Sequence, residues 1–135
     1  MSKRTEVLAR ARERWNAGDL AGYLTLYGDD IRLYGYTPQP MVKREVEAFY
    51  QGIFAAFGSP QLIFHDVLES GDAVTVRFTM TGTHVGAFMG VPPTGRTIAL
   101  PGITILRFEG ETVSERWSCT DLLGLLGQIG PGPGQ

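Results

Sequence analysis

The first half of the chain repeats its apolar residues at the spacing of amphipathic helices. Val7 and Trp15 share one face of a helix predicted over 3–16, and Asp19 is placed to cap a second, short helix that ends at Gly28. A third amphipathic helix is predicted over 43–57 by the same periodicity.

The second half alternates apolar and polar residues with a period of two, which is typical of strands. The predicted strands are 31–36, 61–69, 72–85, 96–108 and 112–120. Ser70-Gly71 and Glu109-Gly110 are turn signals, the Gly- and Pro-rich stretch 86–95 is a loop, and a short apolar helix follows Asp121. Helices first and strands afterwards predict an α+β fold, with helices packed on one face of an antiparallel sheet.

The length of 135 residues corresponds to one domain. We assign this domain to residues 1–130. The last five residues, 131–135, contain only Pro, Gly and Gln and predict a flexible tail.

Composition excludes several classes of function. A net charge of −2 without basic runs argues against nucleic-acid binding. A single Cys and two distant His residues argue against a disulfide framework and against a metal site. The chain has no apolar run long enough to span a membrane and no signal peptide, so we expect no membrane association and a cytoplasmic location.

The predicted hairpin register points to Asp121 as a candidate functional residue. A two-residue turn at Glu109-Gly110 places Trp117, Cys119 and Asp121 on the apolar inner face of the sheet. A carboxylate there is unfavourable unless it is paired, hydrogen-bonded or functional. The alternative is that Asp121 caps the helix that follows, and both roles are compatible.

Two histidines are further candidates. His84 ends a predicted strand on the same face as Met80. Its side chain is either catalytic or structural, since a ring nitrogen can simply bond to the backbone. His65 faces inward if Ser70-Gly71 is a two-residue turn, and a slip of one residue turns it outward.

Aromatic and flexible apolar residues are abundant for a chain of this size. Those that we expect to contact a ligand, or else to fill the core, are Trp15, Tyr34, Tyr50 and Trp117. Phe88 and Met89 lie in the 86–95 loop, where they either line a cavity entrance or form a plug or subunit contact.

Several stretches together resemble the SnoaL-like polyketide cyclase family of the nuclear transport factor two-like superfamily. They are WNAGD at 15–19, GTHVGAFMGVPPTGR at 82–96, LRFEG at 106–110, and ERWSCTD at 115–121 followed by LGLLGQIG at 123–130. The resemblance implies a cone-shaped fold in which a curved, mainly antiparallel sheet packs on three helices around an apolar cavity. It also implies chemistry without a cofactor or metal, and a homodimer.

The family's acid/base carboxylate matches Asp121. We therefore expect a cofactor-independent aldol cyclisation of an apolar or aromatic polyketide-type ligand, with Asp121 as base and His84 or Tyr34 stabilising the enolate oxygen. Gly102 and Thr104 depart from the polar pair that ring-closing members carry on the preceding strand. The alternatives are a cofactor-free hydroxylase, an epoxide-opening hydrolase or cyclase, and a non-catalytic binding module.

The outer face of the sheet is a candidate subunit contact. Ile103 and Ile105 point to this face, beside the threonines of the 72–85 strand. A closed twofold homodimer through the sheet is the predicted assembly.

Overall fold

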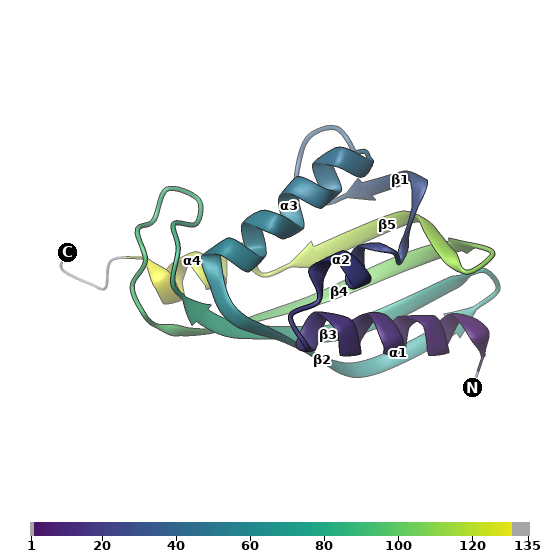
Figure 1. The fold of residues 1–135 in the computed structure, drawn as a ribbon, viewed down its shortest axis with the longest axis horizontal. Coiled ribbons are helices and arrows are strands. Elements are labelled where there is room, and N and C mark those ends of the chain that lie inside the picture. The colour runs from purple at the N-terminus through teal and green to yellow at the C-terminus, as the bar shows by residue number, and fades with distance from the viewer. Residues whose placement is uncertain (1, 131–135) are drawn as a thin grey trace.

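A computed structural model describes residues 2–130, so the predicted tail at 131–135 lies outside the described residues. In the described part, helices and strands follow the predicted α+β order, which confirms the fold class (Figure 1). The elements are α1 (Lys3–Asn16), α2 (Leu20–Leu24), β1 (Tyr27–Tyr34), α3 (Lys43–Ala56), β2 (Phe57–Ser70), β3 (Ala73–His84), β4 (Thr97–Glu109), β5 (Thr112–Thr120) and α4 (Leu122–Ile129).

The five strands form one sheet in the order β1-β5-β4-β3-β2. Only the edge pair β1 and β5 is parallel, and the other pairs are antiparallel. Helices α1, α2 and α3 lie across one face of the sheet, while α4 follows β5 at one end (Figure 1). The apolar core fills the space between this helical layer and the sheet, because both bury their apolar side there.

Three predicted elements have wrong boundaries. The second helix ends at Leu24 and not at Gly28, and the strand predicted over 31–36 spans Tyr27–Tyr34. The strand predicted from residue 61 begins at Phe57, directly after α3, because Phe57 pairs with His84 and extends the β2–β3 hairpin. Pairing with a partner strand outweighs the local signal of Gly58 and Pro60.

The inward faces of β3 and β4 are as predicted. Val74, Val76 and Phe78 of β3 are buried, as are Leu100 and Leu106 of β4. Their strict alternation follows from the period of two in a strand that is covered on one face.

The inward face of β5 is opposite to the prediction. The turn is one residue later than expected, so that Glu109 pairs with Thr112, and Ser114 then forms a bulge between the Arg107–Glu115 and Phe108–Val113 pairs. One extra residue reverses every side chain beyond it. Arg116 and Ser118 therefore face the core, and the predicted inward positions of Trp117, Cys119 and Asp121 are wrong; Cys119 is exposed.

A second bulge decides the orientation of His65. The β2–β3 register shifts between Phe64–Phe78 and Asp66–Arg77, which leaves His65 as the extra residue. Its side chain is exposed, and Nε2 lies 2.8 Å from Thr79 Oγ1. The inward orientation that a two-residue turn predicts for His65 is therefore wrong.

Candidate functional site

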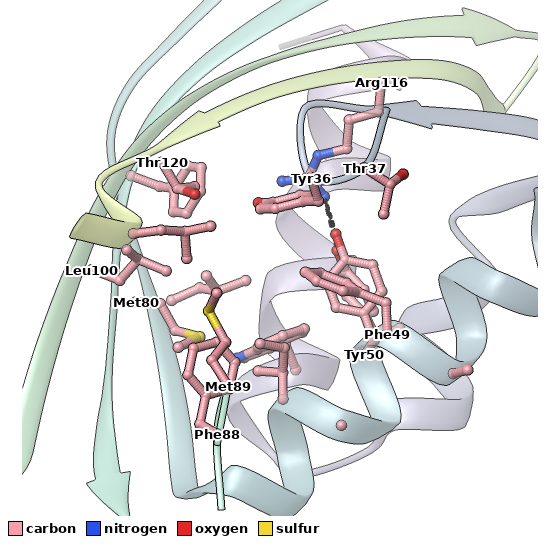
Figure 2. A pocket seen from close by; sticks show the side chains of 18 of the residues that line it. Tyr36, Thr37, Phe49, Tyr50, Met80, Phe88, Met89, Leu100, Arg116 and Thr120 are labelled. Atoms are coloured by element: carbon pink, nitrogen blue, oxygen red, sulfur yellow. Dashed lines mark hydrogen bonds between the residues drawn. The ribbon is translucent and has the colours of Figure 1, made fainter. Parts of the chain in front are cut away.

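A cavity of about 420 Å³ lies between the helical layer and the inner face of the sheet. This volume is within the range of small-molecule sites, about 300–1,000 Å³. The lining comes from α1 to α4, from β2 to β5, from the connection between β1 and α3, and from the 86–95 loop (Figure 2). Its residues are Trp15, Tyr23, Tyr36, Thr37, Ala48, Phe49, Tyr50, Gly52, Ile53, Leu62, Phe78, Met80, Ala87, Phe88, Met89, Leu100, Arg116, Thr120 and Leu122.

Most of this lining is apolar, and the charged exception is Arg116. Arg116 projects from β5 toward the aromatic side chains of the lining, and Figure 2 shows its guanidinium beside Tyr36 and hydrogen-bonded to Tyr50. Exposed lining residues such as Thr37, Gly52 and Met89 mark where the cavity meets solvent. The site is thus an apolar chamber that contains one buried cation.

Three tyrosine hydroxyls surround Arg116 on one side. Its Nη1 donates to the hydroxyls of Tyr23 at 3.1 Å, Tyr50 at 3.0 Å and Tyr27. The Tyr23 and Tyr27 oxygens are 2.6 Å apart, and Tyr27 donates to Tyr50 at 3.1 Å. These tyrosines come from α2, β1 and α3, so the cluster joins three elements to β5.

Thr104 holds the other side of the guanidinium. Arg116 Nε donates to Thr104 Oγ1 at 2.8 Å, while the Thr104 hydroxyl donates to the Trp117 carbonyl at 2.9 Å. Because this hydroxyl gives its proton to the backbone, it is an acceptor for Arg116. Thr104 therefore positions the arginine.

The tyrosines do not neutralise the guanidinium. Burial raises the pKa of Tyr27, Tyr36 and Tyr50 above the usual value, although the charge of Arg116 acts in the opposite direction on each. All three are neutral hydroxyls at physiological pH. None of the ion pairs formed by residues 2–130 includes Arg116, so its charge has no carboxylate partner there.

Four of the predicted ligand-contact residues line this cavity. Trp15 and Tyr50 come from α1 and α3, and Phe88 and Met89 come from the loop after β3. In Figure 2 the loop residues lie across the cavity from Arg116. Their position fits the predicted role at the entrance, and ligand contact itself stays a prediction.

Tyr34 and Trp117 lie on the outer face instead. They are paired residues of β1 and β5, and their rings stack at 5.4 Å with an angle of 7°. Arg107 covers the Trp117 ring at 5.7 Å. Neither aromatic residue lines the cavity, so the structure gives them no place in the site.

Asp121 occupies the alternative role that its sequence context allows. It is the N-cap of α4, and its carboxylate accepts the backbone N–H of Gly124 at 2.9 Å. The residue is exposed and is not among those that line the cavity. Its catalytic role stays a prediction that its position does not favour.

His84 is fully buried but does not line the cavity. Its Nδ1 accepts the backbone N–H of Thr94 at 3.2 Å and lies 3.0 Å from the Thr94 hydroxyl. Nδ1 is therefore unprotonated and Nε2 carries the hydrogen. This contact fastens the end of the 86–95 loop to β3, which is the structural role that the sequence left open.

Sequence reasoning missed Arg116, which it placed on the outer face. A usable signal existed in Tyr23, Tyr27 and Tyr50, because buried tyrosine hydroxyls need polar partners. No sequence signal marks the bulge at Ser114 that turns Arg116 inward. In residues 2–130 no group of three or more His, Cys, Asp or Glu side chains is arranged to hold a metal ion.

None of the helices in the described part combines the length and apolarity that a membrane crossing requires.

The chain belongs to the SnoaL-like polyketide cyclase family, whose model matches residues 5–129. This confirms the family that the sequence motifs indicate. A search of the curated proteins found no match.

Solved structures agree with this assignment. AclR from Streptomyces galilaeus, a candidate hydroxylase, is 30% identical with a TM-score of 0.89, covering 98% of this chain and 99% of its own. A candidate SnoaL-like polyketide cyclase from Jannaschia sp. CCS1 is 26% identical with a TM-score of 0.85, covering 97% and 94%. IdmH, a candidate polyketide cyclase from Streptomyces antibioticus, is 27% identical with a TM-score of 0.80, covering 96% and 100%.

Proposed function

We propose that this protein is a cofactor-independent enzyme that closes a ring in a polyketide-type substrate by intramolecular aldol addition. The observation that carries the proposal is the apolar cavity with a single cationic group, Arg116, in its wall. We place the activity in the cytoplasm, as the sequence predicts.

The apolar part of the cavity would fold the substrate. Phe49, Phe78, Met80 and Leu100 offer surfaces for an aromatic ring and for the carbon chain that it carries. A chain held in a bent conformation brings its two carbonyl groups together, which makes the addition effectively unimolecular. The shape of the cavity would therefore contribute part of the rate acceleration.

The polar part would stabilise the charged oxygen. In an aldol addition the nucleophilic carbon first loses a proton and its neighbouring carbonyl becomes an enolate. Arg116 and the tyrosine hydroxyls are preorganised donors in a chamber of low polarity, where such contacts are strongest. The enolate carbon then forms a bond to the second carbonyl, and the resulting alkoxide takes up a proton from water.

Water is also the proton acceptor in this proposal. The described lining has no Asp, Glu or His that would serve as a base. A carbon between two carbonyls is acidic enough to release its proton to solvent where the cavity opens. This differs from the sequence-based mechanism, in which Asp121 is the base.

Hydroxylation without a cofactor is the second candidate function. The structural likeness to AclR, a candidate hydroxylase, favours it. An enolate or phenolate held at Arg116 is an electron-rich partner for dioxygen: one oxygen atom would enter the substrate and the other would leave as water, with all the electrons supplied by the substrate, which becomes a quinone-type product. Epoxide opening receives no such support, because the described lining contains no carboxylate to activate a water molecule.

The test incubates the purified protein with an aromatic ketone that carries a 1,3-dicarbonyl side chain at the neighbouring ring position. Attack of the carbon between the two carbonyls on the ketone yields a product of unchanged mass that has lost the absorption of the aromatic ketone, and we expect acceleration over buffer of about 10²-fold or more. Incorporation of one labelled oxygen atom from dioxygen would contradict the cyclase proposal and favour the hydroxylase. Binding of the compound without turnover would favour a non-catalytic binding module.

Two matched variants on α3 separate catalysis in the cavity from reaction elsewhere. Gly52 lines the cavity, and a Cβ added there meets no atom within 4 Å, so Gly52→Trp should cover the opening without disturbing the helix. Gln51→Trp places the same ring on an exposed position outside the lining. We expect kcat/KM to fall about tenfold or more for Gly52→Trp alone. Equal rates in both variants would contradict the proposal.

A further inference from the structure

The hydrogen-bond donors of Arg116 are not all used. Nε donates to Thr104, and Nη1 faces the three tyrosine hydroxyls. No partner within residues 2–130 accepts from Nη2. Nη2 is not fully enclosed by protein atoms, so it is accessible to a ligand in the cavity that Arg116 lines.

Tyr50 offers a second donor beside it. Its oxygen accepts hydrogen bonds from Arg116 Nη1 at 3.0 Å and from the Tyr27 hydroxyl at 3.1 Å. Its own proton is shared only with the Tyr23 hydroxyl, an interaction that helps to raise the pKa of Tyr50, and Tyr50 lines the same cavity, so a ligand oxygen there would compete with Tyr23 for this proton. Because Nη1 and Nη2 share one guanidinium carbon, a single ligand oxygen can accept from both Nη2 and Tyr50.

The charge of the site points to an anion. Arg116 is 9% exposed and has no carboxylate partner within residues 2–130, and burial raises the pKa of the neighbouring Tyr27 and Tyr50 so that both stay neutral. A buried, unpaired charge costs several kcal/mol of stability. A bound anion would offset part of that cost. A neutral ligand would instead displace water from the cation and increase the cost.

We propose that Arg116 Nη2 and the Tyr50 hydroxyl form an oxyanion site that selects ligands ionised at a single oxygen, namely enolates and phenolates. The inference rests on the proposed function and names its substrate class. A carboxylate fits less well, since the two-nitrogen fork that arginine offers to carboxylates is occupied at Nε by Thr104 and at Nη1 by the tyrosines.

The test uses two probes of similar shape. The hydroxyl of 7-hydroxycoumarin ionises near neutral pH, and its neutral and phenolate forms absorb at different wavelengths, while 7-methoxycoumarin cannot ionise. Titrating bound 7-hydroxycoumarin should show a pKa lowered by about one unit or more relative to the free probe, because a neighbouring cation favours the charged form. Above that pKa the hydroxy probe should bind about tenfold more tightly than the methoxy probe.

Variants assign the effect to the two donors. Arg116→Met keeps the length of the side chain and should abolish the pKa shift of the bound probe. Tyr50→Phe removes one hydroxyl and should roughly halve the pKa shift of the bound probe. This variant also tests the site if Arg116→Met does not fold. Met80→Leu changes only the apolar lining and should alter the affinity of both probes alike, with the pKa shift retained.

The outcomes separate this inference from the proposed function. An unchanged or raised pKa with both probes bound would overturn the oxyanion site and leave a ligand-binding cavity in place. A probe pKa that is lowered to the same extent in Arg116→Met and in Tyr50→Phe as in the unaltered protein would also overturn it. Failure of both probes to bind, with Gly52→Trp and Gln51→Trp equally active, would overturn the cavity itself.

Discussion

At the scale of single residues, Arg116 connects parts of the chain that are remote in sequence. Its guanidinium contacts Tyr23, which lies 93 positions earlier, as well as Tyr27 and Tyr50. A buried arginine is rarely favourable for stability alone, because the loss of hydration offsets the attraction to its neighbours. Its presence in an otherwise apolar chamber fits the ligand-binding role that we propose.

Asp121 is the residue for which a substitution best separates two roles. Asp121→Ala should lower the free energy of unfolding by about 1 kcal/mol, because the Gly124 N–H loses its acceptor, and Asp121→Asn should lower it less. Urea denaturation measures both. Affinity for 7-methoxycoumarin should not change, since Asp121 is exposed and outside the cavity lining.

Turnover of Asp121→Asn is the decisive control. We expect it to remain within a few-fold of the unaltered protein. A folded Asp121→Asn variant that loses about 10² or more in turnover would restore Asp121 as the acid/base residue and contradict the mechanism with water as proton acceptor.

At the scale of elements, α3 combines a structural and a functional face. Val46, Tyr50 and Ile53 are buried against the core, while Ala48, Phe49 and Gly52 also border the cavity. A glycine in a helix is conformationally costly, so its presence at the exposed edge of the cavity suits access and not helix stability.

Replacing Gly52 with alanine should therefore stabilise the protein. A Cβ at this position meets no atom within 4 Å, and alanine gains about 0.5–1 kcal/mol over glycine inside a helix. Thermal unfolding should show a higher Tm. As a contrast, Gly35→Ala should lower Tm, because its φ is +119° and the new Cβ would meet the Ser118 carbonyl oxygen. A lower Tm for Gly52→Ala would contradict this account of α3.

The junction of β3 with the 86–95 loop depends on His84. His84→Phe keeps a ring of comparable size but removes the acceptor of the Thr94 N–H. Exchange of the Thr94 amide hydrogen should accelerate about fivefold, corresponding to a net hydrogen bond of about 1 kcal/mol. Hydrogen exchange read by NMR measures this.

Thr94→Ser is the matched control, because it keeps the backbone N–H and the hydroxyl that face His84. Its exchange rate should stay close to that of the unaltered protein. Equal exchange in His84→Phe would mean that the loop is held by other contacts, for example by the packing of Phe88 on Phe57.

At the scale of the whole molecule, the two faces of the sheet are used differently. The inner face builds the core and the cavity, whereas the outer face exposes apolar residues that one chain does not cover. Ile63, Ile103 and Ile105 are 46%, 52% and 41% exposed. Such an exposed apolar surface favours a contact between molecules, and a twofold contact is the commonest closed arrangement.

We therefore expect a homodimer through the outer face, as the sequence predicts. Light scattering at micromolar concentration should give twice the chain mass of 14.8 kDa. Ile105→Lys should yield the monomer mass, because it places a charge within the contact. Leu123→Lys, on the exposed surface of α4, should leave the dimer intact. A monomer mass for the unaltered protein would contradict the expectation.

The sequence by itself determined the features that depend on local periodicity. Periodicity predicts the order of helices and strands and the buried faces of β3 and β4. A strand covered on one face must alternate apolar and polar residues, and an amphipathic helix must repeat its apolar residues every three to four positions. The family motifs are likewise visible in the sequence. The capping role of Asp121 was also available from the residues that follow it.

Tertiary structure alone decided which side chains meet. The bulge at Ser114 adds one residue to β5, turns Arg116 inward, and turns Trp117 outward to stack on Tyr34. Nothing in the local pattern marks that residue, since a strand with a bulge and a strand without one have nearly the same composition. Strand periodicity placed Arg116 on the wrong face for this reason: register across strands is set by packing over the whole sheet, and a shift of one position exchanges the two faces.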